Sequence, residues 1–180
     1  MTETTGTDDD RRFPPALTEV ARTEFPYEDD HSIDFEPYEA FDSAEETTDW
    51  LRHWTGNHEL DGSAYRVFGQ DGTGGLAALW LARPGLPLVD QPVVFMGSEG
   101  QNGVVAGCLS DFLWVLADGL GPCEVVVLED DSSYPDAALP ALADIAARHA
   151  TTPRRPAREI IAAAQAEFPT FEEDLEKLCR

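Results

Sequence analysis

The residues that most resemble metal ligands are His53 and His58. Their neighbours Asp49 and Glu59 would complete a set with the donor types of a zinc site. The spacing argues against that site, because histidines five positions apart do not share one face of a helix, and Gly56 between them is placed to end one. We therefore expect ordinary surface histidines and neither a metal nor a cofactor.

A second motif with potential chemistry is the glycine-rich segment at residues 69–75. Phosphate-binding loops also need a Lys followed by Ser or Thr, which this segment lacks, and Asp71 would repel an anion. The segment at residues 97–100 contains Ser98, but its glycines are not placed two positions on either side of the serine, as a nucleophile elbow requires. Both segments are predicted to be turns.

The cysteines and the carboxylates add no catalytic group. Cys108, Cys123 and Cys179 are odd in number and lack a CxxC spacing, so we interpret them as reduced packing residues. Carboxylates are so frequent that no pair stands out as an acid–base couple. We therefore expect a protein that is not an enzyme.

Charge is the most unusual property of the chain. Its 180 residues are 42% hydrophobic, which suits one globular domain, but 35 Asp and Glu oppose 12 Lys and Arg for a formal net charge of −23. Such a surface repels nucleic acid and anionic lipid, whereas it attracts basic proteins. Simple solubility is the alternative explanation of the same excess.

The acidity is concentrated in the first third of the chain. Residues 1–62 hold 18 acidic and 4 basic side chains. The only basic cluster is Arg148, Arg154, Arg155 and Arg158, which we expect to offset the acidic body and to serve helix ends, with a partner contact as the alternative. The predicted partner-binding residues are Asp29, Asp30, Asp34 and Glu36 in the acidic segment, and Asp71 and Glu99 in the two turns.

The ends of the domain and its compartment also follow from composition. Residues 1–12 are predicted to be a solvated acidic tail, and residues 13–180 a single domain. The N-terminus has no apolar region typical of a signal peptide, and no apolar run approaches the length of a membrane span. A cytoplasmic location is therefore expected.

Helices are predicted from caps and apolar spacing. Ser43 and Glu46 form a capping box, an apolar face follows, and Gly56 is placed to end that helix. A second helix is predicted from Ser110 to about Asp118, with Leu109 and Trp114 as a hydrophobic staple. A third is predicted after Pro135, with Arg148 and His149 in its last turn. Two more are predicted to begin at Pro156 and at Thr170, where Glu173 completes a second capping box.

Strands are predicted between the first two helices. Residues 65–68, 76–82, 92–96 and 103–106 are strand-like and are joined by short turns, which favours an antiparallel meander. Residues 123–128 are a candidate edge strand. The predicted fold class is therefore α+β, with an antiparallel sheet of about four to six strands flanked by helices.

The middle of the chain resembles a known superfamily. Two runs carry the resemblance: Tyr65-Arg66-Val67-Phe68-Gly69-Gln70-Asp71-Gly72-Thr73-Gly74-Gly75 before a strand, and Gln91-Pro92-Val93-Val94-Phe95-Met96-Gly97-Ser98-Glu99-Gly100 leading to Ser110-Asp111-Phe112-Leu113. Together they are similar to the SUKH superfamily, the domain of the Smi/Knr-type cell-wall assembly regulators, over about residues 60–120. The resemblance implies a SUKH-like fold.

For bacterial members, the same resemblance implies an immunity protein that binds and neutralises a polymorphic toxin, often a nuclease. A basic toxin would be attracted by a net charge of −23. In one variant of this hypothesis, carboxylates such as Asp34 and Glu36 imitate the phosphates of DNA. The alternatives are a housekeeping scaffold or regulator with the same fold and, below it, a small hydrolase dependent on a carboxylate or on His53 and His58.

Overall fold

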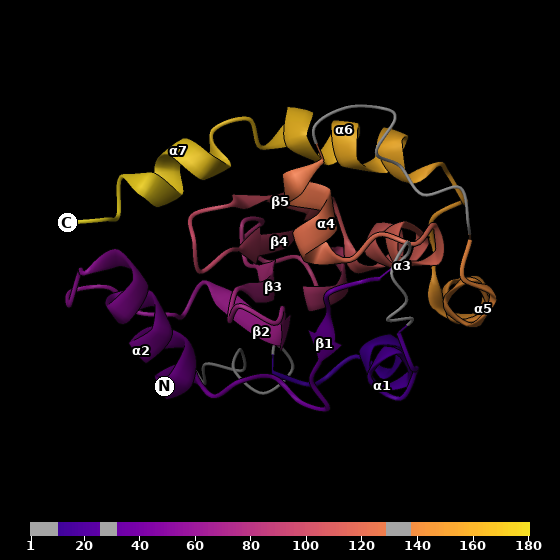
Figure 1. Cartoon of the computed structure of the whole chain (residues 1–180), viewed down its shortest axis with the longest axis horizontal. Helices are drawn as coiled ribbons and strands as arrows, with labels where there is room; N and C mark the ends of the chain where they lie inside the picture. Colours follow the sequence, from indigo (N-terminus) through magenta and orange to yellow (C-terminus); the bar gives the residue numbers. More distant parts are fainter. Residues whose placement is uncertain (1–10, 26–31, 129–137) are drawn as a thin grey trace, which may run out of the picture.

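The computed structural model describes residues 11–25, 32–128 and 138–180. Five antiparallel strands form one sheet in chain order, and helices cover both of its faces (Figure 1). The predicted α+β class with an antiparallel meander is thereby confirmed. In chain order the described elements are α1 (Pro15–Ala21), β1 (Glu36–Pro37), α2 (Ala44–Thr55), β2 (Tyr65–Gln70), β3 (Leu76–Trp80), the 3₁₀ turn η1 (Leu88–Asp90), β4 (Val93–Met96), β5 (Asn102–Ala106), α3 (Leu109–Ala117), α4 (Pro122–Val127), α5 (Pro140–His149), α6 (Ala157–Glu167) and α7 (Phe171–Glu176).

The hairpin of β2 and β3 is the centre of the predicted meander. Tyr65 pairs with Trp80 at one end and Gln70 with Leu76 at the other. A bulge precedes Gly69, where a Cβ atom would lie 2.4 Å from the ring of Phe35, so only glycine fits under that ring.

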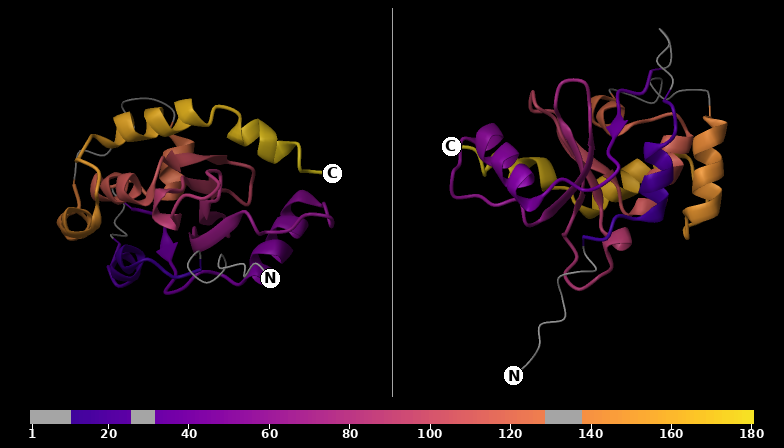
Figure 2. Two further views of the ribbon diagram at one scale, coloured as in Figure 1. Left: turned by 180° about the vertical axis from the view of Figure 1, so that it is seen from behind. Right: turned by 90° about the horizontal axis from the view of Figure 1, so that it is seen from below.

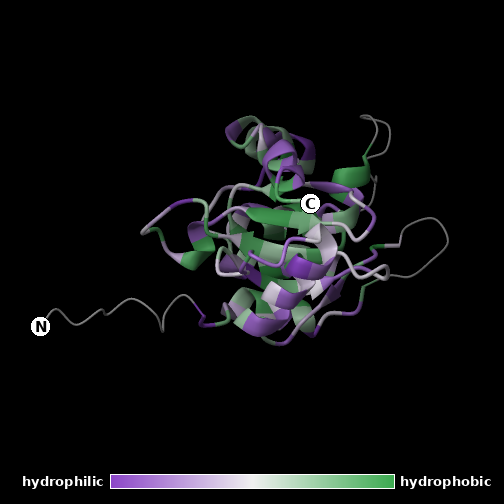
Figure 3. Cartoon of the chain, turned by 90° about the vertical axis from the view of Figure 1, so that its left-hand side faces the viewer, coloured by the Kyte–Doolittle hydropathy of each residue, from purple (hydrophilic) through white to green (hydrophobic). Residues whose placement is uncertain are grey.

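The sheet separates two layers of the hydrophobic core. In the right-hand view of Figure 2, α2 and the C-terminus lie on one side of the strands, and α1 and α5 lie on the other. The apolar residues gather along the strands between these layers (Figure 3). On the α1, α3 and α5 side the sheet contributes Phe68, Ala77, Leu79, Val93, Phe95 and Val105. On the α2 and α7 side it contributes Tyr65, Val67, Leu76, Ala78, Val94, Met96 and Val104.

Helix α2 begins and ends as its sequence predicts. The Ser43 hydroxyl accepts from the backbone N–H of Glu46 over 3.1 Å, and the Glu46 carboxylate accepts from the backbone N–H of Ser43 over 2.9 Å. Gly56 follows the helix at φ +67°, in the left-handed region that favours glycine.

Three contacts predicted at the starts of α3 and α7 do not form, although Thr170 does precede α7 as predicted. Helix α3 begins at Leu109 with Cys108 before it, so Ser110 is not its cap, and the Leu109–Trp114 staple does not form. The Ser110 hydroxyl instead accepts from the backbone N–H of Thr151. At α7, the Thr170 hydroxyl donates to the Asp174 carboxylate and forms no capping box with Glu173.

Residues 123–128 do not form the predicted edge strand. They belong to helix α4, which opens with Pro122 in its first turn. Gly103 of β5 has no room for a Cβ atom, which would lie 2.8 Å from Val126, so α4 packs closely against the outer strand. Packing on β5 therefore overrides the β propensity of the valines.

Helix α1 is not predicted from the sequence, because its apolar face is only two turns long. It buries Leu17 and Val20 against the core, and the Glu19 carboxylate accepts from Arg148 and contacts His149 of α5, over 2.5 and 2.8 Å. Within the described ranges, the helices are all too short or too polar to cross a membrane.

Candidate partner-binding surface

The acidic segment lies against the turn between β2 and β3. Asp34 accepts from the backbone N–H of Gly72 through Oδ1, over 2.8 Å. Glu36, exposed in β1, accepts from the side-chain amide of Gln70 over 2.9 Å. The predicted partner residues Asp29 and Asp30 lie outside the described residues. The structure therefore joins Asp34 and Glu36 to one end of the sheet.

The other two predicted partner residues differ in exposure. Asp71 is only 4% exposed, and its Oδ1 accepts from the backbone N–H groups of Thr73 and Gly75, so it forms the turn and is not positioned for the expected partner contact. Glu99 is exposed in the turn between β4 and β5. A 2.9 Å hydrogen bond between the hydroxyls of Thr73 and Ser98 joins the two turns.

Tyr38 lies among the carboxylates of this surface. Its hydroxyl donates to the side-chain carbonyl of Gln70 over 2.8 Å. Burial, followed by the smaller effects of the charges of Asp42, Glu36 and Glu46, raises the pKa of Tyr38 to about 12. Burial and then the charge of Glu46 also raise the pKa of Asp42. The carboxylates around Tyr38 therefore repel one another, and a positively charged group would relieve this repulsion.

Helix α2 carries further carboxylates and is fixed to both turns. The indole N–H of Trp50 donates to the carbonyl of Gly74, and that of Trp54 donates to the carbonyl of Gly97, each over 3.1 Å. The two indole rings stack with centroids 5.6 Å apart. These two hydrogen bonds hold α2 against both turns and so fix the position of the helix. The carboxylates that α2 exposes to solvent are Glu45, Glu46 and Asp49.

We define the acidic face as the surface formed by residues 32–51. This stretch has seven Asp and Glu and no Lys or Arg. Prediction from the sequence selected Asp34 and Glu36 but missed Glu39, Asp42 and the acids of α2. These additional acids could have been recognised in the sequence, because the twenty residues from 32 to 51 include no Lys or Arg.

Much of the positive charge of the protein is paired elsewhere. Six of the twelve Lys and Arg form ion pairs with carboxylates in the described residues, which agrees with the offsetting role expected for the arginine cluster. The pairs are Arg83–Glu167, Arg148–Glu19, Arg154–Asp118, Arg155–Asp111, Lys177 with Glu173 and Asp174, and Arg180–Glu59.

A buried carboxyl connects the acidic segment to α4. Glu124 accepts from the backbone N–H of Asp34 through Oε1, over 2.7 Å, while its buried Oε2 has no hydrogen-bond partner among the described residues. Burial, and to a lesser degree the charge of Asp34, raises the pKa of Glu124. Burial and the charges of Glu124 and Asp71 raise the pKa of the adjacent Cys123 thiol to about 12, so this cysteine is protonated at neutral pH and is a weak nucleophile.

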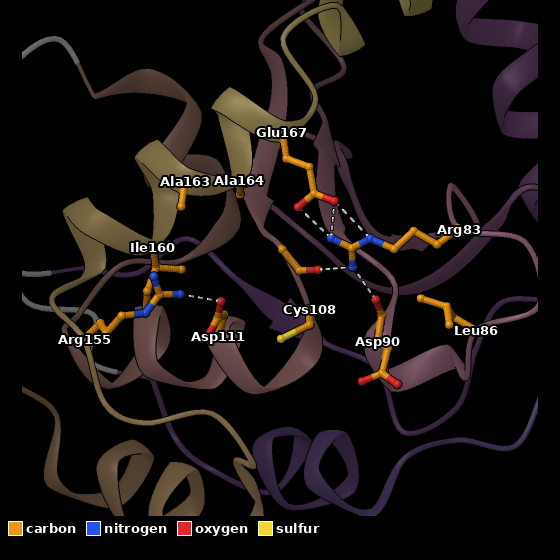
Figure 4. A pocket seen from close by; sticks show the side chains of 11 residues that line it. Arg83, Leu86, Asp90, Cys108, Asp111, Arg155, Ile160, Ala163, Ala164 and Glu167 are labelled. Carbon is orange, nitrogen blue, oxygen red and sulfur yellow. Dashed lines mark hydrogen bonds and ion pairs between the residues drawn. The ribbon is translucent and has the colours of Figure 1, made fainter.

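A pocket of about 290 Å³ lies between α6, the start of α3 and the loop that follows β3 (Figure 4). On one side Arg83 binds both carboxylate oxygens of Glu167, over 2.6 and 2.7 Å, and donates to the carbonyl of Gly107. On the other side Arg155 donates to Asp111 over 2.9 Å. Both guanidinium groups already have carboxylate partners within the pocket wall.

Cys108 lies between these two pairs (Figure 4). Burial raises the pKa of the Cys108 thiol, although the backbone amides of Asp111 and Ser110 oppose that shift. A thiol with a raised pKa is not an activated nucleophile. The pocket therefore combines two satisfied ion pairs with a protonated cysteine, which does not amount to a catalytic set.

The candidate zinc ligands do not form a site. His53 and His58 are both exposed, as expected of ordinary surface histidines. No group of three or more His, Cys, Asp or Glu side chains could hold a metal ion within residues 11–25, 32–128 and 138–180.

Comparison of the chain with protein-family models, with curated proteins and with solved structures found no match.

Proposed function

We propose that this chain is a non-enzymatic, cytoplasmic protein-binding domain that neutralises a basic protein, in the manner of an immunity protein against a toxin. The observation that carries the proposal is the acidic face, a stretch of twenty residues with seven carboxylates and no Lys or Arg, of which Glu36, Asp42 and Glu46 lie close enough to Tyr38 to raise its pKa. The SUKH-like sequence pattern described above is consistent with this role.

Electrostatics explains how this surface would select its partner. A net charge of −23 increases the encounter rate with a basic protein and repels nucleic acid and anionic membranes. Arg83, Arg148, Arg154 and Arg155 are held by internal carboxylates, so they compensate little of the charge on the acidic face. A toxin that binds phosphate through basic residues has the complementary charge.

Rigidity adds to this complementarity. The acidic face is attached to the sheet by the hydrogen bonds of Trp50 and Trp54 and by that of Asp34 to Gly72. A surface that is already ordered loses less conformational entropy when it binds.

Binding to the purified product of the neighbouring gene tests the proposal, with affinity measured by titration calorimetry over a series of salt concentrations. We expect a complex that weakens as salt rises. The test variant neutralises four exposed carboxylates of the acidic face: Glu36→Gln, Glu39→Gln, Glu45→Gln and Asp49→Asn. The control variant makes the same change in net charge elsewhere: Asp144→Asn, Glu159→Gln, Glu172→Gln and Glu176→Gln.

The two variants separate a specific surface from general attraction. The proposal predicts at least about a tenfold loss of affinity in the test variant and a much smaller loss in the control. Equal losses would show that only net charge matters, and absence of binding by the wild type at every salt concentration would refute the proposed function.

A further inference from the structure

The loop between β3 and β4 presents apolar side chains to solvent. Leu86 is 50% exposed and Val89 is 44% exposed, and the only other large hydrophobic residue so exposed in the described parts of the chain is Val127. We propose that Leu86 and Val89 form the apolar anchor of the interface with the basic protein partner. This inference rests on the proposed function and adds the surface that holds the partner after electrostatic encounter.

The loop is held from inside by Gln91, which is only 2% exposed. Its side-chain oxygen accepts from the backbone N–H of Arg83 over 2.9 Å, and its amide donates to the carbonyls of Arg83 and Leu86 over 2.7 and 3.2 Å. These bonds close the loop on itself. The buried Gln91 side chain, hydrogen-bonded through both its oxygen and its nitrogen, therefore fixes the backbone conformation in which Leu86 is exposed.

Two further contacts fix the loop to the body of the protein. The Arg83 guanidinium donates to the carbonyls of Asp90 and Gly107, which joins the end of the loop to the start of α3. Leu88, between the two exposed residues, is 8% exposed and packs into the core. An apolar residue displayed on such an ordered loop costs little conformational entropy on binding.

The neighbouring pocket provides space beside this anchor. Leu86 forms part of the pocket wall together with Ile160, Ala163 and Ala164 of α6 (Figure 4). A volume of about 290 Å³ can receive a side chain of the partner. The ion pair of Arg83 with Glu167 belongs to the same wall, so the space beside Leu86 is lined by both apolar and charged side chains.

The charges around the loop favour a basic partner over a second copy of this chain. Asp90 is exposed and forms no ion pair with the described residues, and the Glu167 side chain is 49% exposed. The Asp90 carboxylate can accept Lys or Arg from a partner, whereas both oxygens of Glu167 already accept from Arg83. Two copies of a chain with a net charge of −23 would repel each other.

Binding of the neighbouring gene product to a Leu86→Ser, Val89→Ser double variant tests the anchor. We expect at least about a tenfold weaker affinity, mainly from faster dissociation, with an unchanged dependence on salt because no charge is altered. Val127→Ser is the matched control, since it removes an equally exposed valine from α4, and it should bind within about twofold of the wild type. Leu86→Ser alone serves if the double variant does not fold, as judged by circular dichroism.

Each outcome has one meaning. Weaker binding by the Leu86 and Val89 variants alone supports the anchor. Wild-type affinity in these variants would overturn the anchor and leave the proposed function standing. A wild-type protein that binds nothing at any salt concentration would overturn both, whereas oligomers that disappear in the double variant would show that a second copy occupies the loop.

Discussion

Asp71 and Gly75 close the turn between β2 and β3 by a reciprocal pair of hydrogen bonds. The Asp71 carboxylate accepts from the backbone N–H of Gly75 over 2.8 Å, and the backbone N–H of Asp71 donates to the carbonyl of Gly75 over 3.0 Å. The same carboxylate oxygen accepts from the backbone N–H and the hydroxyl of Thr73. One buried oxygen thus organises the turn that supports the acidic face.

Asp71→Ala should therefore lower the free energy of unfolding by about 2 kcal/mol, because it leaves buried amides without an acceptor. Asp71→Asn should lower it much less, since the amide oxygen can replace Oδ1. Glu99→Ala, in the exposed turn, should change it by less than about 0.5 kcal/mol. Urea denaturation measures all three, and equal effects of Asp71→Ala and Glu99→Ala would contradict the structural role of Asp71.

The two predicted capping boxes differ in the structure and should differ in energy. Ser43→Ala removes a real cap from α2 and should cost about 1 kcal/mol of unfolding free energy. Thr170→Ala removes only an exposed bond to Asp174 and should cost less than about 0.5 kcal/mol. Thermal or urea unfolding of the two variants provides the comparison, and a larger loss for Thr170→Ala would be inconsistent with these contacts.

Arg83 should stabilise the fold chiefly through its bonds to backbone carbonyls. Arg83→Ala is expected to cost about 2 kcal/mol of unfolding free energy, because the carbonyl of Gly107 loses a charged donor. Glu167→Gln should cost less than about 1 kcal/mol, since its half-exposed ion pair is screened by water. Arg83→Lys should not restore wild-type stability, because an ammonium group cannot reproduce the forked geometry. The measurement is again urea denaturation, and full rescue by lysine would exclude this explanation.

Glu124 should make stability depend on pH. Its pKa in the folded protein lies above the ordinary value of 4.5, so the folded state favours the protonated carboxyl. The contribution of Glu124 to the free energy of unfolding is therefore greatest below pH 4.5, where the carboxyl is protonated, and it is lost as pH rises through the higher pKa of the folded protein. Glu124→Gln cannot lose a proton, so its stability relative to the wild type should increase between pH 4 and pH 8. Melting temperatures of the two proteins across that range test this, and a constant difference would rule out a raised pKa at Glu124.

Patterns among residues close together in the sequence were sufficient to predict the central helix and strands of the fold. The capping box at Ser43, the left-handed glycine at position 56 and the turns between strands depend on atoms a few residues apart, so they can be recognised without knowledge of the rest of the chain. The concentration of acids in residues 32–51 is equally local, and it is the basis of the candidate surface.

Tertiary contacts decided the features that depend on distant residues. The valines of α4 favour a strand by themselves, but packing against β5 and Pro122 in the first turn produce a helix. Asp71 and Glu99 both lie in glycine-containing turns between strands, yet only Asp71 is buried among amides that need its carboxylate. The pairing of Arg148 with Glu19, 129 positions away, exists only because α5 packs on α1. Burial and long-range pairing are properties of the folded chain as a whole, and they determine which of its many carboxylates remain available to a partner.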